Sequence, residues 1–111
     1  MTYTYTGPFT ATLRLDYVEA GGTNLIVFAV QPESDGHCRV YTSIYRNDIA
    51  AEAMAAAVAF EERVLAEDLV IQHRMRPSLP LDLTTEVHVK ADRLTIELRR
   101  ILAELVGASV E

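Results

Sequence analysis

The sequence changes character once, near Asn47, and this change limits the folds open to the chain. Before it, apolar and polar residues alternate, which is typical of strands with one buried face. After it, Ala, Glu, Met and Leu predominate, and apolar residues recur at helical spacing. Because the strands come first and the helices second, we predict an α+β domain with an antiparallel sheet.

Three strands are expected before the change, over residues 9–17, 25–30 and 38–46. The middle one is a continuous apolar run, which favours a strand covered on both faces, and Pro32 should end it. Residues 21–24 and 33–36 are rich in turn formers. Such short turns make a meander the simplest topology. A sheet of this kind leaves an edge open, and residues 3–6 are a candidate fourth strand.

Two helices should follow the strands. Asn47 and Asp48 are predicted to cap the first, which continues to about Arg76 as one long helix or two shorter ones. Residues 77–81 contain two prolines and cannot continue it. The last helix is expected from about Asp92 to Val106, before Gly107. The expected fold is thus α+β, a meander of three to four strands followed by a long helix and a C-terminal helix. Residues 1–111 should form a single domain.

Composition excludes several classes of function. The formal net charge is −6, so the average surface repels nucleic acid and anionic lipid, and neither is an expected partner. No apolar stretch predicts a membrane span, and the first residues do not resemble a signal peptide, so we expect a cytoplasmic location. Cys38 is the only cysteine, which excludes an internal disulfide and any cysteine-rich metal site built by this chain alone.

The most informative position is Asp68. On a helical projection, the apolar residues Phe60, Val64, Ile71 and Met75 share one face, and Asp68 falls next to Met75. An unpaired buried carboxylate is costly, so such a residue usually faces a cation, a metal or several hydrogen-bond donors. The alternative is that the stripe is wide and its acids reach solvent at its margin.

Other side chains on or near this stripe offer partial support for a metal site. Glu61 and Gln72 occupy the same stripe as Asp68 and are candidates to assist it. The three histidines are His37, His73 and His88. None makes a recognisable metal-binding pair. Ligands on one helix need a spacing of three or four residues, whereas Asp68 and His73 are five apart. No residue is assigned a direct catalytic role.

Several segments together resemble the C-terminal part of the catalytic domain of Rieske-type non-haem iron oxygenases, the large subunits of aromatic ring-hydroxylating and demethylating enzymes. The matching stretches are residues 30–32, 38–42, 46–48, 60–68, 91–93 and 97–100. The resemblance implies a helix-grip, or START-like, fold in which a sheet wraps a long helix around an apolar pocket. It implies Asp68, preceded by Glu67, as the carboxylate ligand of an Fe(II) site held by two histidines and one carboxylate. Phe60, Val64, Ile71 and Met75 would face the substrate pocket.

The chain departs from that family in two respects. The family's Asp-x-x-His-x-x-x-x-His pattern is absent, and one cysteine cannot hold a Rieske cluster. We therefore expect part of an oxygenase that is inactive alone and binds no iron by itself. Its expected partners are an apolar or aromatic small molecule and either a second copy or a complementary oxygenase chain. One alternative is a free-standing helix-grip domain that binds an apolar ligand or a partner chain without catalysis, and another is a dimerisation module.

Overall fold

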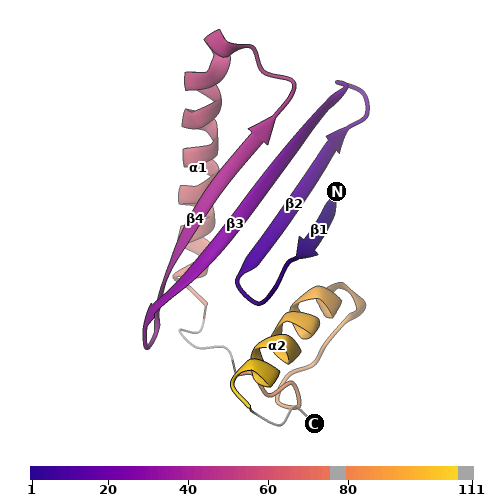
Figure 1. Ribbon diagram of the computed structural model, residues 1–111, viewed down its shortest axis with the longest axis vertical. Helices are drawn as coiled ribbons and strands as arrows, with labels where there is room; N and C mark the ends of the chain where they lie inside the picture. Colours follow the sequence, from indigo (N-terminus) through magenta and orange to yellow (C-terminus); the bar gives the residue numbers. More distant parts are fainter. Residues whose placement is uncertain (76–79, 108–111) are drawn as a thin grey trace.

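The computed structural model describes residues 1–75 and 80–107, which form a four-stranded antiparallel sheet followed by two helices (Figure 1). The strand order is β1-β2-β3-β4, a simple meander. This confirms the predicted α+β fold, and the candidate fourth strand is β1. The elements are β1 (Thr2–Tyr5), β2 (Thr10–Tyr17), β3 (Gly22–Ser34), β4 (His37–Arg46), α1 (Met54–Gln72) and α2 (Arg93–Leu105), with short 3-10 turns at Ala51–Ala53 and Lys90–Asp92.

Cross-strand pairing gives the sheet one apolar face. Tyr3 pairs with Leu13, Leu13 with Ile26, and Ile26 with Ile44, so one row of large side chains crosses all four strands. The adjacent row, which points to the opposite face, contains Thr4, Thr12, Val27 and Ser43. Successive side chains of a strand alternate between faces, so the alternating sequence directs its apolar half toward α1.

The middle strand differs from the prediction in length and in burial. β3 begins at Gly22, so Gly22, Thr23 and Asn24 are strand rather than turn, and it continues through Pro32 to Ser34. The register shifts between Pro32 and Ser34, and such an irregularity accommodates a proline that lacks an amide donor. Leu25–Val30 is only partly covered, and Ala29 is exposed. The prediction of two covered faces was therefore wrong.

The segment between β4 and α1 is also organised differently from the prediction. Asn47 and Asp48 do not cap the helix, because their acceptors are used elsewhere. Asn47 Oδ1 accepts a hydrogen bond from the Thr23 amide at 2.7 Å, and Asp48 pairs with Arg46. No side chain caps α1, which follows directly from the 3-10 turn. α1 is one long helix. Of the predicted break at residues 77–81, residues 77–79 lie outside the described residues, and residues 80 and 81 are not helical.

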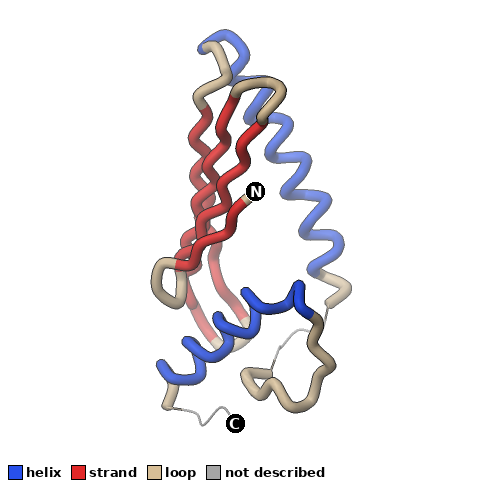
Figure 2. Tube along the Cα trace, turned by 90° about the vertical axis from the view of Figure 1, so that its right-hand side faces the viewer, coloured by secondary structure: helices blue, strands red, loops and turns tan. Residues whose placement is uncertain are grey.

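The two helices occupy different places around the sheet. Figure 2 shows α1 running along one face of the sheet, whereas α2 lies at the lower end of the molecule. α2 agrees closely with the predicted C-terminal helix, and Gly107 follows it with a φ of 68°. Within α2 the buried residues are Arg99 and Ala103.

The described residues bury few side chains. Among them, Leu13 and Ala103 are the only buried apolar side chains, and α1 has no buried residue. The radius of gyration is 16.6 Å, whereas a compact domain of this length has about 13 Å. No helix in the described part of the chain has the length and apolar character needed to cross a membrane. Much of the apolar surface between α1 and the sheet is therefore left open.

Candidate active site

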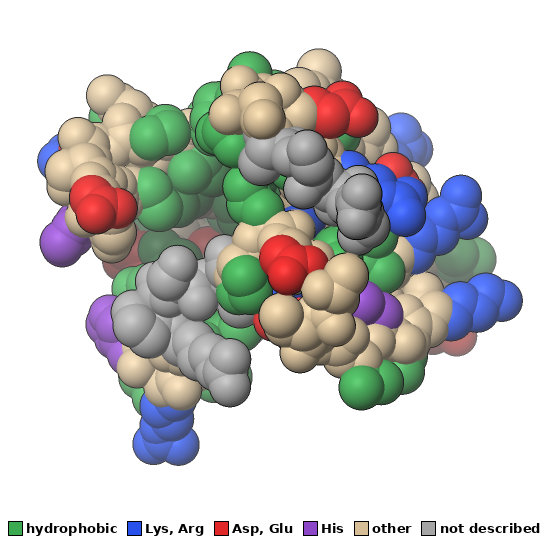
Figure 3. All heavy atoms as spheres, turned by 90° about the horizontal axis from the view of Figure 1, so that it is seen from below, with side chains coloured by type: hydrophobic (Ala, Val, Ile, Leu, Met, Phe, Trp, Pro, Cys, Tyr) green, Lys and Arg blue, Asp and Glu red, His purple; other side chains and the backbone are tan. Residues whose placement is uncertain are grey.

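A cavity of about 700 Å³ lies between the apolar face of the sheet and α1. From below, hydrophobic side chains are seen around a hollow at this end of the molecule (Figure 3). The volume is within the range of small-molecule sites, about 300–1,000 Å³. The residues that line the cavity are Tyr3, Leu13, Leu15, Tyr17, Asn24, Ile26, Phe28, Thr42, Ile44, Arg46, Ile49, Met54, Ala57, Val58, Phe60, Glu61, Glu62, Val64, Leu65 and Asp68.

The helical wall of the cavity follows the periodicity of α1. Met54, Val58, Glu61, Leu65 and Asp68 are separated by four, three, four and three residues, so they lie on one face of the helix. Two carboxylates therefore point to the same side as the apolar residues. Asp68 stands at the C-terminal end of this wall, two turns from Glu61.

The structure separates the predicted site residues into two groups. Phe60, Val64, Glu61 and Asp68 line the cavity, whereas Ile71, Met75, Glu67 and Gln72 are not among the lining residues. Ile71 and Met75 are 63% and 55% exposed. The predicted stripe and the lining face of α1 thus agree as far as Asp68, where the lining ends.

Part of the cavity wall was not predicted from the sequence, namely the sheet residues and the first turns of α1. The pattern from Met54 to Asp68 was available as a signal for the helical wall. The sheet wall depends on which face of each strand meets α1, and that is set by tertiary packing.

Asp68 lines the cavity and is also exposed to solvent. Its carboxylate therefore lies at the margin of the apolar wall, which was the alternative considered from the sequence. No ion pair or hydrogen bond of Asp68 is found within residues 1–75 and 80–107. The acid is accessible from the cavity for a cation supplied from elsewhere.

The histidines are not placed around Asp68. His37 begins β4, His73 follows the last residue of α1, and His88 lies beside Leu83, with Nε2 3.0 Å from its carbonyl oxygen. None of them lines the cavity. Nowhere in the described part of the chain do three or more His, Cys, Asp or Glu side chains gather where they could hold a metal ion. These residues therefore offer iron one carboxylate and do not fit a complete iron site.

The upper end of the cavity is polar. Arg46 donates from Nε and Nη2 to the two carboxylate oxygens of Asp48, at 2.9 and 2.8 Å. The hydrogen bond from Arg46 holds the pKa of Asp48 below its usual value, and the same bond, with a smaller contribution from Glu61, raises the pKa of Arg46. Asn24, on the strand next to Arg46, is buried, and its Oδ1 accepts no hydrogen bond from any described residue.

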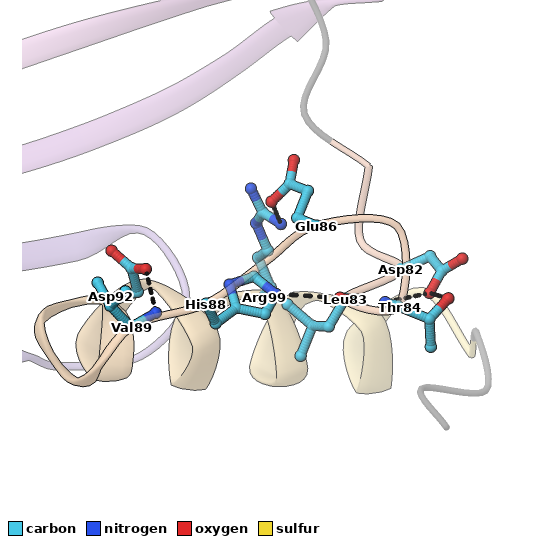
Figure 4. A network of polar contacts seen from close by, with 8 residues as sticks. All are labelled: Asp82, Leu83, Thr84, Glu86, His88, Val89, Asp92 and Arg99. Atoms are coloured by element: carbon cyan, nitrogen blue, oxygen red, sulfur yellow. Dashed lines mark hydrogen bonds and ion pairs between the residues drawn. The ribbon is translucent and has the colours of Figure 1, made fainter.

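A second polar cluster lies beside α2, away from this cavity (Figure 4). Arg99 Nη1 donates to Glu86 Oε2 at 2.6 Å, and Asp92 Oδ2 accepts from the Val89 amide at 2.9 Å. Asp82 accepts from both the amide and the hydroxyl of Thr84. The Arg99–Glu86 contact joins the segment before α2 to the helix itself, whereas the contacts of Asp92 and Asp82 lie within that segment, so we assign all of them a structural role.

Two comparisons with known proteins bear on the identity of the chain. Comparison with curated proteins gives no match. The family model described as "Vanillate O-demethylase oxygenase C-terminal domain" matches residues 1–108, which is nearly the whole sequence. Vanillate O-demethylase oxygenase is a Rieske-type oxygenase. The chain therefore belongs to the family of vanillate O-demethylase oxygenase C-terminal domains, which form part of Rieske-type oxygenases.

Proposed function

We propose that this chain forms one side of the substrate pocket of a Rieske-type oxygenase and contributes Asp68 as the carboxylate ligand of its mononuclear iron. The observation that supports this most directly is the position of Asp68 on the wall of a large apolar cavity between α1 and the sheet. A carboxylate at the margin of an apolar pocket is open to both a metal ion and a bound substrate.

An aromatic substrate suits this cavity. Phe28 and Ile26 on the sheet and Phe60 on α1 offer apolar surface to a ring, and a ring gains free energy when it leaves water for such surface. The family name refers to vanillate, an aromatic methyl ether. We therefore propose an aromatic methyl ether as the substrate class.

The iron site requires ligands that these residues do not provide. Asp68 has the donor chemistry that a site of two histidines and one carboxylate needs, but His37, His73 and His88 are elsewhere. Bound iron, supplied with electrons, would activate dioxygen. The residues of this chain would bind and orient the ring, exclude water from it, and present one carboxylate oxygen at the end of the cavity.

The first test uses the purified chain alone. With Fe(II), an electron donor and an aromatic methyl ether, we expect no substrate-dependent oxygen uptake, because one carboxylate binds Fe(II) weakly and Cys38 cannot hold a cluster alone. Oxygen uptake that depends on the substrate would contradict the proposal that the chain is only part of the active enzyme.

The second test restores the missing parts. The chain is co-expressed with the cluster-bearing and histidine-bearing portion of a vanillate O-demethylase oxygenase, and iron content and oxygen uptake of the purified complex are measured. Asp68→Asn should lower oxygen uptake by about tenfold or more and remove the mononuclear iron, so that total iron falls from about three to about two atoms per complex, because the [2Fe–2S] cluster keeps two. Glu104→Gln is the matched control, because it removes the charge of another exposed helical carboxylate that does not line the cavity. An Asp68→Asn complex that keeps its mononuclear iron, in addition to the two irons of the cluster, would refute the assignment of Asp68.

A further inference from the structure

Glu61 is the least exposed long side chain of α1, although it is an acid. Within Met54–Gln72, Ala57 and Glu61 are partly buried and all other residues are exposed, including the apolar Phe60 and Leu65, which are 50% and 49% exposed. Glu61 lines the cavity and makes no hydrogen bond or ion pair within residues 1–75 and 80–107. A partly buried carboxylate without a partner is costly. The missing hydrogen-bond donor should therefore come from the cavity.

Arg46, the last residue of β4, lines the same cavity from the sheet. Its Nε and Nη2 atoms donate to Asp48, whereas its Nη1 makes no hydrogen bond to any described residue. The hydrogen bond to Asp48 is the main cause of the raised pKa of Arg46, and the charge of Glu61 adds to that rise, so the two side chains are near one another. Their charged atoms are nevertheless more than 4.0 Å apart. A small group can therefore lie between the Glu61 carboxylate and Arg46 Nη1.

The charges at this end of the cavity favour a neutral polar group. Asp48 already neutralises Arg46, so a carboxylate placed between Arg46 and Glu61 would meet the uncompensated charge of Glu61. An ammonium ion in the same place would meet the guanidinium and would lose its hydration beside the apolar wall. A hydroxyl group offers one donor to the carboxylate and an acceptor to the guanidinium, so it satisfies both without adding charge.

We propose that Glu61 and Arg46 together bind a hydroxyl group on the aromatic ring, an inference that rests on the aromatic pocket of the proposed function. The hydroxyl donates to the Glu61 carboxylate and accepts from Arg46 Nη1. Glu61 and Asp68 are seven residues apart on one face of α1, about 10 Å along the helix, so a ring held at Glu61 extends toward Asp68. The site sets no condition on the other substituents, and a carboxylate elsewhere on the ring is compatible with it.

The test is an NMR titration of the purified chain at neutral pH with two probes, 4-hydroxy-3-methoxybenzoate and 3-methoxybenzoate, which differ only in the hydroxyl group. We expect the hydroxylated probe to bind about tenfold more tightly, as a hydrogen bond to a charged group allows. Glu61→Leu should reduce this ratio of affinities to about one. Glu67→Leu is the matched control, because it removes an equal charge from an exposed residue of the same helix that does not line the cavity. It should leave the ratio unchanged.

Arg46→Lys tests the second partner of the hydroxyl. Lysine keeps a cation beside Asp48 but has no Nη1, so the ratio should fall to about threefold. A ratio as high as that of the unmodified chain would contradict the part assigned to Arg46.

The outcomes separate this inference from the proposed function. If both probes bind with equal affinity, the hydroxyl site is refuted while the aromatic pocket stands. If neither probe binds, the aromatic pocket itself fails, and the hydroxyl site with it. A ratio that persists in Glu61→Leu, or that falls as far in Glu67→Leu, would refute the role of Glu61. The comparison of the two probes on the unmodified chain does not depend on the folding of any variant.

Discussion

At the scale of single residues, the polar end of the cavity depends on a glycine. Gly22 begins β3 and is buried against Asp48, and a Cβ added to it would lie 2.7 Å from the Asp48 Cβ atom. The backbone φ of Gly22 is not in the left-handed region, so space and not conformation requires glycine here. The close approach of Asp48 also sets the position of its ion pair with Arg46, which lines the cavity.

Gly22→Ala should therefore destabilise the chain by about 1–3 kcal/mol, the usual cost of an added carbon in a packed site. The measurement is urea unfolding of the wild type and the variant. Asp48→Gly supplies the second side of a double-mutant cycle, because it removes the Cβ, Cγ and Oδ2 atoms with which the new methyl group collides. In the Asp48→Gly background the added methyl group should cost less than about 0.5 kcal/mol. Equal costs in both backgrounds would show that the collision is not the cause.

At the scale of elements, α2 carries two adjacent arginines with different surroundings. The Arg99 side chain is 9% exposed and donates to Glu86, whereas the Arg100 side chain is 53% exposed and donates to Glu97 within the same helix. Arg99 joins α2 to the segment that precedes it, so its loss should loosen the whole element.

Arg99→Ala should lower the free energy of unfolding by about 2–3 kcal/mol, because it removes a largely buried charge partner and its packed aliphatic stem. Arg100→Ala is the matched control and should cost about 0.5 kcal/mol or less, as exposed ion pairs do. Both substitutions make the same change in helix propensity. Thermal and urea unfolding would measure the difference, and similar costs at the two positions would contradict the structural role of the Arg99–Glu86 pair.

Elements with strong periodicity were predictable from the sequence, whereas their contacts were not. The alternation in residues 9–17 and the apolar spacing in α2 each report a local period, and both elements were found close to their predicted bounds. The prediction that β3 ends at Pro32 was wrong, because an irregular register between β3 and β4 accommodates the proline. The caps assigned to Asn47 and Asp48 were wrong because both side chains bind tertiary partners, Thr23 and Arg46.

The candidate site shows the same division between local pattern and tertiary placement. A helical projection was enough to mark Asp68 as an acid beside an apolar stripe, and the structure places it on the cavity wall. The projection could not say where along α1 the sheet stops covering it, so Ile71 and Met75 fall outside the lining. Asn24 gave no signal in the sequence, because its lack of a partner follows from the pairing of β2, β3 and β4.

At the scale of the whole molecule, the described residues expose far more apolar surface than an isolated small domain usually does. α1 has no buried residue, and large apolar side chains such as Val58, Leu65 and Ile71 are about half exposed or more. Exposed apolar patches of this extent mark surfaces that bind other chains. β4 is also an edge strand of ten residues with one unpaired side. Both features favour association between copies when no other chain covers them.

We therefore expect the purified chain to self-associate, with a mass by light scattering that exceeds 12.3 kDa and rises with concentration. Burial of apolar area supplies the free energy, about 25 cal/mol for each Å² removed from water. Leu65→Lys places a charge in the middle of the exposed face of α1 and should shift the equilibrium toward monomer. Val18→Lys introduces the same charge in the turn after β2, where the residue is 93% exposed, and should leave the mass unchanged. A monomer at millimolar concentration would instead mean that the chain tolerates its open apolar face in water, and the argument from exposed area would fail.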